Sequence, residues 1–140
     1  MSTSPVWFKV VAVIAILWNL IGCLAFVSDI RLTPEDLANL PEAQQALYNA
    51  RPGWAVAGTA VAVVGGLLGS IALLFGKKWA VPMLIASLLG ILVQDVAMFV
   101  LADGATLAGP MAVVMQAIVL VNAIGLILLG RMAMARGWLR

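Results

Sequence analysis

The sequence predicts an all-α integral membrane protein, an up-down-up-down bundle of four transmembrane helices with a short helical loop on one side. Of its 140 residues, 64% are hydrophobic and only 10% are charged, whereas about a quarter of the residues of a soluble domain carry charge. Four apolar stretches reach the roughly 20 residues that a helix needs to cross a bilayer core. Most connections are short, so consecutive helices are expected to be antiparallel neighbours within one domain, residues 1–140. The stretches are residues 7–27, 54–76, 79–102 and 110–130.

The first span, residues 7–27, opens near Lys9 and contains no further charge. Its segment Leu20-Ile21-Gly22-Cys23 is similar to the lipobox at which a bacterial lipoprotein signal peptide is cut. The apolar run continues beyond Cys23, however, where a lipoprotein normally turns polar, and it is too long for a signal h-region. We therefore expect a retained helix. Cys23 is the only cysteine and histidine is absent, which excludes an intramolecular disulfide, a CxxC redox pair and a zinc cluster.

Residues 28–53 form the only sizeable connection. Thr33-Pro34-Glu35-Asp36 combines an N-cap residue, a proline at the first helical position and acids in the first turn, all of which favour a helix start. A second start is indicated at Pro41-Glu42, and Arg51-Pro52-Gly53 favours a break. We expect one or two short helices over the outer mouth of the bundle. They form either a cap that closes the bundle or a lid that gates a solute.

The second span, residues 54–76, carries a small-residue stripe. Its members recur at alternating steps of four and three, which places them on one face of the helix: Gly58, Ala62, Gly65, Gly69, Ala72 and Gly76. In lipid, helices associate by close backbone contact across such residues. The stripe therefore predicts a helix contact, either within the chain or with another copy. We expect it to pair with a weaker seam on the first span, formed by Ala12, Ala15, Asn19 and Gly22.

Charged residues distinguish the two ends of the bundle. One end collects six cations and no acid: Lys9, Lys77, Lys78, Arg131, Arg136 and Arg140. The other two connections hold five acids, Asp103 among them, and only two cations, Arg31 and Arg51. The positive-inside rule therefore places both termini and the Lys77-Lys78 turn in the cytoplasm. The net charge of +2 reflects this asymmetry and does not indicate nucleic-acid binding.

The first, third and fourth spans carry polar side chains into the membrane. With about 1.5 Å of rise per residue, four of these side chains are expected in one polar layer in the outer half of the bundle, with Asn122 slightly inward of the midplane: Asn19, Gln94, Asp95 and Gln116. Asp95 is the only ionisable member, and a charged Asp near a helix centre costs about 2.5–3.5 kcal/mol. We therefore expect Asp95 to face the bundle in its protonated form and to donate a hydrogen bond to Asn19 or Gln116.

Two interpretations of the polar layer stay open. In one, Asp95 exchanges a proton or cation while a small polar solute moves through a cavity lined by Asn19, Gln94, Gln116 and Trp18. In the other, the layer is a hydrogen-bonded clamp that fixes the register of the helices, since interhelical polar contacts contribute about 0.6–2 kcal/mol. Enzymatic activity is not expected. The sequence offers no histidine, no paired intramembrane carboxylates, no nucleophile beside a base and no metal-ligand cluster, so we predict no metal and no cofactor.

Several short strings, spread over nearly the whole chain, resemble a known group of proteins. The strings are Trp18-Asn19-Leu20-Ile21-Gly22, Leu40-Pro41-Glu42-Ala43-Gln44, Lys77-Lys78-Trp79-Ala80, Leu92-Val93-Gln94 and Gly137-Trp138-Leu139. In them the chain is similar to an uncharacterised group of small four-helix inner-membrane proteins of bacteria, sometimes labelled as sugar transporters. The resemblance implies the bacterial inner membrane and, through Asn19 and Gln94, favours the polar layer as the site. The small multidrug resistance type is similar only in size and topology, because its first helix carries a glutamate where this chain has Asn19.

These observations predict a transporter-like membrane protein that binds or moves a small polar solute through the polar layer around Asp95. The alternative is a non-transporting scaffold or regulatory subunit that acts through helix–helix contacts of the small-residue stripe. Because a four-helix bundle alone encloses little room for a solute, we also expect a homodimer in the lipid bilayer.

Overall fold

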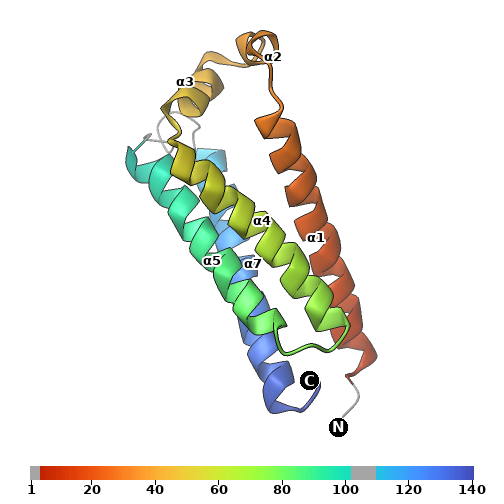
Figure 1. Cartoon of the computed structure of the whole chain (residues 1–140). Helices are drawn as coiled ribbons and strands as arrows, with labels where there is room; N and C mark the ends of the chain where they lie inside the picture. Colours follow the sequence, from red (N-terminus) through yellow and green to blue (C-terminus); the bar gives the residue numbers. More distant parts are fainter. Residues whose placement is uncertain (1–3, 102–109) are drawn as a thin grey trace.

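The structure, a computed structural model, describes residues 4–101 and 110–140, and within them the chain is helical and contains no strand. Four helical stretches there are long and apolar enough to cross a membrane. They are α1 (Val6–Ile30), α4 (Gly53–Leu74), α5 (Ala80–Asp95) with its π-helical continuation η1 (Val96–Leu101), and α7 (Pro110–Ala135). Figure 1 shows them as an up-down-up-down bundle with the start of α1 and the end of α7 at the same end. The chain is a four-span membrane protein, and the predicted fold class is confirmed.

The connection between the first two spans contains two short helices, α2 (Pro34–Ala38) and α3 (Glu42–Ala50). The predicted start at Thr33 is confirmed by a capping box. The Thr33 Oγ1 atom accepts a hydrogen bond from the Asp36 N–H at 3.1 Å, and the Asp36 carboxylate accepts one from the Thr33 N–H at 3.2 Å. Both short helices lie beyond the ends of α1 and α4, at the end of the bundle opposite the termini (Figure 1).

Two glycines in the left-handed region end helices at the terminal end of the bundle. Gly76 has φ +69° and Gly137 has φ +75°. After α4 the Lys77 N–H donates to the Ala72 carbonyl at 2.8 Å and the Gly76 N–H donates to Leu73 at 3.1 Å, the pattern of a Schellman cap. Gly76, which the sequence places in the stripe, is therefore a helix-capping residue. The same pattern follows α7 at Gly137.

The C-terminal tail closes this end of the bundle. The Arg140 N–H donates to the Gly76 carbonyl at 2.7 Å, and the Lys78 N–H donates to the Arg140 carbonyl at 2.8 Å. Beside these bonds the Trp138 ring lies edge-on to Phe8, with ring centroids 5.2 Å apart, and to Trp7 at 5.8 Å. Phe8 is fully buried. The main core therefore lies near the termini, where the ends of α1, α4, α5 and α7 converge.

The small-residue stripe of α4 packs against α5 of the same chain. A Cβ atom on Gly58 would stand 2.7 Å from Val93 Cγ1, and one on Gly65 would stand 3.0 Å from the Met83 carbonyl oxygen. Five stripe members are buried: Gly58, Ala62, Gly65, Gly69 and Ala72. The expected pairing of the stripe with the first-span seam was therefore wrong, because the neighbouring α5 occupies this face. Occupied in this way, the stripe offers no free surface to a second copy.

Helix α1 packs on a second face of α4, next to the stripe. The residues of this face follow the stripe residues by one position in the sequence. The Asn19 side chain of α1 donates to Ser70 Oγ at 3.3 Å, and a Cβ on Gly66 would collide with the Asn19 amide. Nearer the outer end, a Cβ on Gly22 would lie 3.4 Å from Val63 Cγ1. Asn19 of the first-span seam therefore meets small residues of α4 at Gly66-x-x-x-Ser70, beside the stripe.

Candidate functional site

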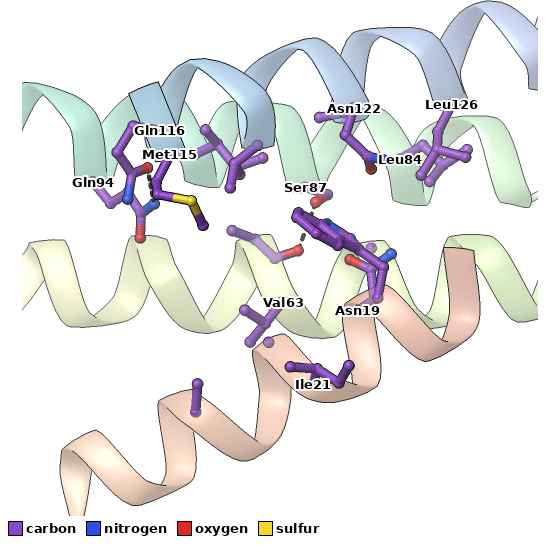
Figure 2. A pocket seen from close by; sticks show the side chains of 18 residues that line it. Asn19, Ile21, Val63, Leu84, Ser87, Gln94, Met115, Gln116, Asn122 and Leu126 are labelled. Carbon is purple, nitrogen blue, oxygen red and sulfur yellow. Dashed lines mark hydrogen bonds between the residues drawn. The ribbon is translucent and has the colours of Figure 1, made fainter. Parts of the chain in front are cut away.

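A cavity of about 410 Å³ lies between the four spanning helices. Each helix contributes side chains to its wall, for example Asn19 from α1, Ala62 from α4, Gln94 from α5 and Gln116 from α7. The volume falls within the roughly 300–1,000 Å³ that is usual for small-molecule sites. Figure 2 shows Gln94 and Gln116 at one end of the cavity, Asn19, Ser87 and Asn122 further along it, and Leu84 and Leu126 beyond them. The helices of one chain therefore leave room for a small solute between them, although the pocket is partly open and lining residues such as Ile21 and Met115 are exposed.

The outer end of the cavity is formed by a pair of amides. The Gln94 Nε2 atom donates to Gln116 Oε1 at 3.2 Å, and Gln94 Oε1 accepts from Thr59 Oγ1 at 2.7 Å. Thr59 is itself fixed, since its hydroxyl lies 3.1 Å from the carbonyl oxygen of Ala55, one turn earlier. The side chain of Gln94 is thus held at both amide atoms, whereas Gln116 is held at its oxygen only within the described part of the chain.

A second polar group, formed by Asn19, Ser87 and Asn122, lies further along the cavity toward the termini (Figure 2). The Asn19 Nδ2 atom donates to the Ala15 carbonyl at 2.9 Å and to Ser70 Oγ at 3.3 Å. The Ser87 hydroxyl donates to the Ala62 carbonyl at 2.6 Å, which links α5 to α4. Seven residues separate Ser87 from the outer amide Gln94, so the two polar groups lie about 10 Å apart along α5.

The other walls of the cavity are apolar. Between the two polar groups they include Ile91 of α5 and Val119 of α7. Leu84 and Leu126 line the cavity beyond Ser87 and Asn122, toward the termini (Figure 2). Trp18 of α1 also lines the cavity and is 38% exposed in the bundle, so that one part of its indole faces outward. Among the residues that the structure describes, no charged residue lines this cavity.

Asp95 does not line the cavity, although the sequence placed it at the centre of the polar layer. Its Oδ1 atom is buried and has no hydrogen-bond partner among the described residues. The bond expected from Asp95 to Asn19 or Gln116 is not formed, because both amides line the cavity and Asp95 lies outside its wall. Successive residues of a helix point about 100° apart, and of this pair Gln94 lines the cavity while Asp95 points to one side of it.

The structure therefore brings together four of the five site residues predicted from the sequence. Trp18, Asn19, Gln94 and Gln116 line one cavity and Asp95 lies outside it. The predicted single layer is instead two polar groups at different depths along the cavity. In residues 4–101 and 110–140 no group of three or more His, Cys, Asp or Glu side chains is placed to hold a metal ion.

Comparison with known proteins assigns the chain to no family. No protein-family model, no curated protein and no solved structure matches the chain. What is established is a four-span membrane protein with a pocket between its helices.

Three residues of the site were missed or undervalued in the sequence. Ser87 and Asn122 line the cavity, and Ser70 holds Asn19. A signal for Ser87 was present in the spacing of α5, where four lining residues recur at steps of three and four and so share one face of the helix: Leu84, Ser87, Ile91 and Gln94.

Proposed function

We propose that this protein binds a small, uncharged, hydrogen-bonding solute in the cavity between its four helices and moves it across the membrane. The observation that carries the proposal is that Asn19, Gln94, Gln116 and Asn122, from three different helices, line one cavity inside the bundle. Polar side chains in a bilayer are costly and usually face the bundle interior or a water-filled cavity. Their convergence on an open space favours a ligand site over a closed structural clamp.

The chemistry of the wall supports an uncharged solute. Amide side chains offer both donors and acceptors, and charged side chains are absent from the lining. An ionised solute would enter this space without a counter-charge, at a high desolvation cost. The Gln116 Nε2 atom and the Asn122 amide have no protein partner among the described residues, so they are free to bind a solute.

The apolar middle of the cavity narrows the class further. Ile91, Val119 and the Trp18 indole suit a molecule with an apolar face between hydrogen-bonding groups. Sugars and related polyols have this character, because the C–H face of a ring packs on apolar or aromatic side chains while the hydroxyls bind amides. The resemblance to bacterial inner-membrane proteins labelled as sugar transporters points to the same class.

The membrane and the orientation belong to the same proposal. The end of the bundle formed by the termini and the α4–α5 turn carries Lys77, Lys78 and Arg140, and the positive-inside rule assigns such an end to the cytoplasm. We place the protein in a bacterial inner membrane on the basis of the resemblance. The loop with α2 and α3 then faces outward.

A binding measurement tests the proposal. The protein in lipid nanodiscs is heated with D-glucose or mannitol, and with D-gluconate as a charged match, while its unfolding temperature is recorded. A ligand that binds only the folded state stabilises it by RT ln(1 + [L]/Kd), so at least one uncharged solute is expected to raise the unfolding temperature. Gln116→Leu should abolish the rise, whereas Val121→Leu, at a position that is 69% exposed on the same helix, should keep it.

Two results would count against a solute site. A solute supplied at 100 times a millimolar Kd would stabilise the folded state by about 2.7 kcal/mol. If none of the uncharged solutes shifts the unfolding temperature at concentrations up to this level, the cavity does not bind this class. If Gln116→Leu and Val121→Leu respond alike, the stabilisation does not arise in the cavity.

A further inference from the structure

A second cavity of about 170 Å³, the outer vestibule, lies on the loop side of the amide pair. Its wall includes Arg51, Thr59 and Met98 together with Gln94 and Gln116. The last two residues also line the main cavity. The hydrogen-bonded amides of Gln94 and Gln116 therefore form the partition between the two spaces.

The two halves of this partition are held unequally. Gln94 is fixed at its oxygen by Thr59 Oγ1, 2.7 Å away, and at its nitrogen by Gln116 Oε1, 3.2 Å away. Gln116 is held through its oxygen alone within the described residues. Breaking one hydrogen bond thus frees the Gln116 side chain to rotate, while Gln94 stays bound to Thr59.

The mouth of the vestibule, at Arg51, carries an ion pair whose two charges cancel. Arg51 Nη1 lies 2.5 Å from the Asp29 carboxylate at the end of α1, with both side chains about one-third exposed or less. The Arg51 guanidinium also lies 4.9 Å from the centre of the Tyr48 ring. An ion pair at this position keeps the mouth hydrated without setting a net charge across it.

We infer that solute reaches the main cavity from the loop side through the outer vestibule, and that the Gln94–Gln116 pair is the gate it passes. The inference rests on the proposed function. A solute with neighbouring donor and acceptor groups replaces the amide–amide bond with bonds to itself, because the opened pair presents the Gln94 N–H and the Gln116 carbonyl. A purely apolar molecule gives no such replacement. The gate thus selects for uncharged, hydrogen-bonding solutes.

Access of a thiol reagent to the main cavity tests the gate. Cys23→Ser removes the only native cysteine, and Asn122→Cys places a thiol on the cavity wall beyond the gate. The protein is reconstituted in liposomes and labelled from outside with a glucose-linked methanethiosulfonate, an uncharged, hydrogen-bonding thiol reagent that crosses a bilayer poorly. Separate variants with Glu35→Cys in α2 or Lys77→Cys in the α4–α5 turn, both exposed positions, report the fraction of molecules that presents each end to the reagent.

The labelled fraction at position 122 is expected to equal the fraction labelled in Glu35→Cys. Adding Gln116→Phe should fill the gate and slow labelling at least tenfold, and Gln116→Ala should accelerate it severalfold. Gln116→Leu, of similar volume to the native residue, should also slow labelling if the phenylalanine variant fails to fold. Val121→Phe, on the lipid-facing side of α7, is the matched control and should leave the rate unchanged.

The outcomes separate the gate from the proposed function. Labelling that follows the Lys77→Cys fraction, or that is indifferent to the size of residue 116, overturns the gate while leaving a solute cavity in place. A folded protein whose position 122 is not labelled from either side has a cavity closed to water. That result overturns the proposed function together with the gate.

Discussion

Gly90 of α5 lies against Gly58 of α4 so closely that a Cβ atom on Gly90 would stand 2.5 Å from the Gly58 carbonyl oxygen. The same Cβ would lie 2.7 Å from the backbone nitrogen of Ala62. Both neighbours are backbone atoms and cannot rotate away. The seam between α4 and α5 therefore depends on glycine at position 90, and this seam positions the Ser87 and Gln94 sides of the cavity.

Gly90→Ala is expected to destabilise the bundle by about 1–3 kcal/mol, because the added methyl forces the two helices apart. Unfolding of the detergent-solubilised protein in increasing sodium dodecyl sulfate measures the change. Gly125→Ala is the matched control, since a Cβ at that glycine meets nothing within 4 Å. Equal stability of the two variants would show that α4 and α5 do not approach as described.

Gly76→Ala is expected to cost about 1–2 kcal/mol for a different reason. Gly76 adopts φ +69°, and the left-handed region is unfavourable for a residue with a Cβ by about that amount. The added Cβ would also stand 3.1 Å from the Trp138 carbonyl oxygen. The same unfolding assay applies, with Gly53→Ala, whose Cβ meets nothing within 4 Å, as the variant that should leave stability unchanged.

The sequence was sufficient for the spans and the loop helices, because these depend on local signals. Apolar length predicted α1, α4, α5 and α7, and Thr33 predicted the start of α2. The partner of the stripe was not predictable in the same way, since small residues show that some helix approaches closely but not which one. The tight contact at Gly90 was missed because one glycine in an apolar run is not distinguished from any other.

The candidate site was predicted in part, and the part that was missed again depends on tertiary contacts. Counting residues from the centre of each span gives the depth of a side chain but not the direction in which it points around the helix. Gln94 and Asp95 have nearly equal depth, yet only Gln94 lines the cavity. The direction is set by the packing of α5 on α4 through Gly58 and Gly90, which is a tertiary contact.

Asp95→Asn is expected to leave the cavity unchanged, because Asp95 lies outside its wall. Labelling of Asn122→Cys should stay within about twofold of the parent rate, and solute-induced stabilisation should persist. Asp95→Leu is expected to be neutral or stabilising, since it removes a buried oxygen that has no partner among the described residues. Loss of solute uptake in a folded, solute-binding Asp95→Asn protein would instead assign Asp95 a role in proton coupling.

The Arg51–Asp29 pair is expected to contribute little to stability despite its short distance of 2.5 Å. Its side chains are 26% and 35% exposed, and ion pairs that water reaches are typically worth about 0.2–1 kcal/mol. A double-mutant cycle with Arg51→Gln and Asp29→Asn measures the coupling free energy directly, and we expect it to fall as salt screens the charges. A coupling well above this range, insensitive to salt, would show that the mouth of the vestibule is dry, and would contradict the hydrated mouth through which the solute is proposed to pass.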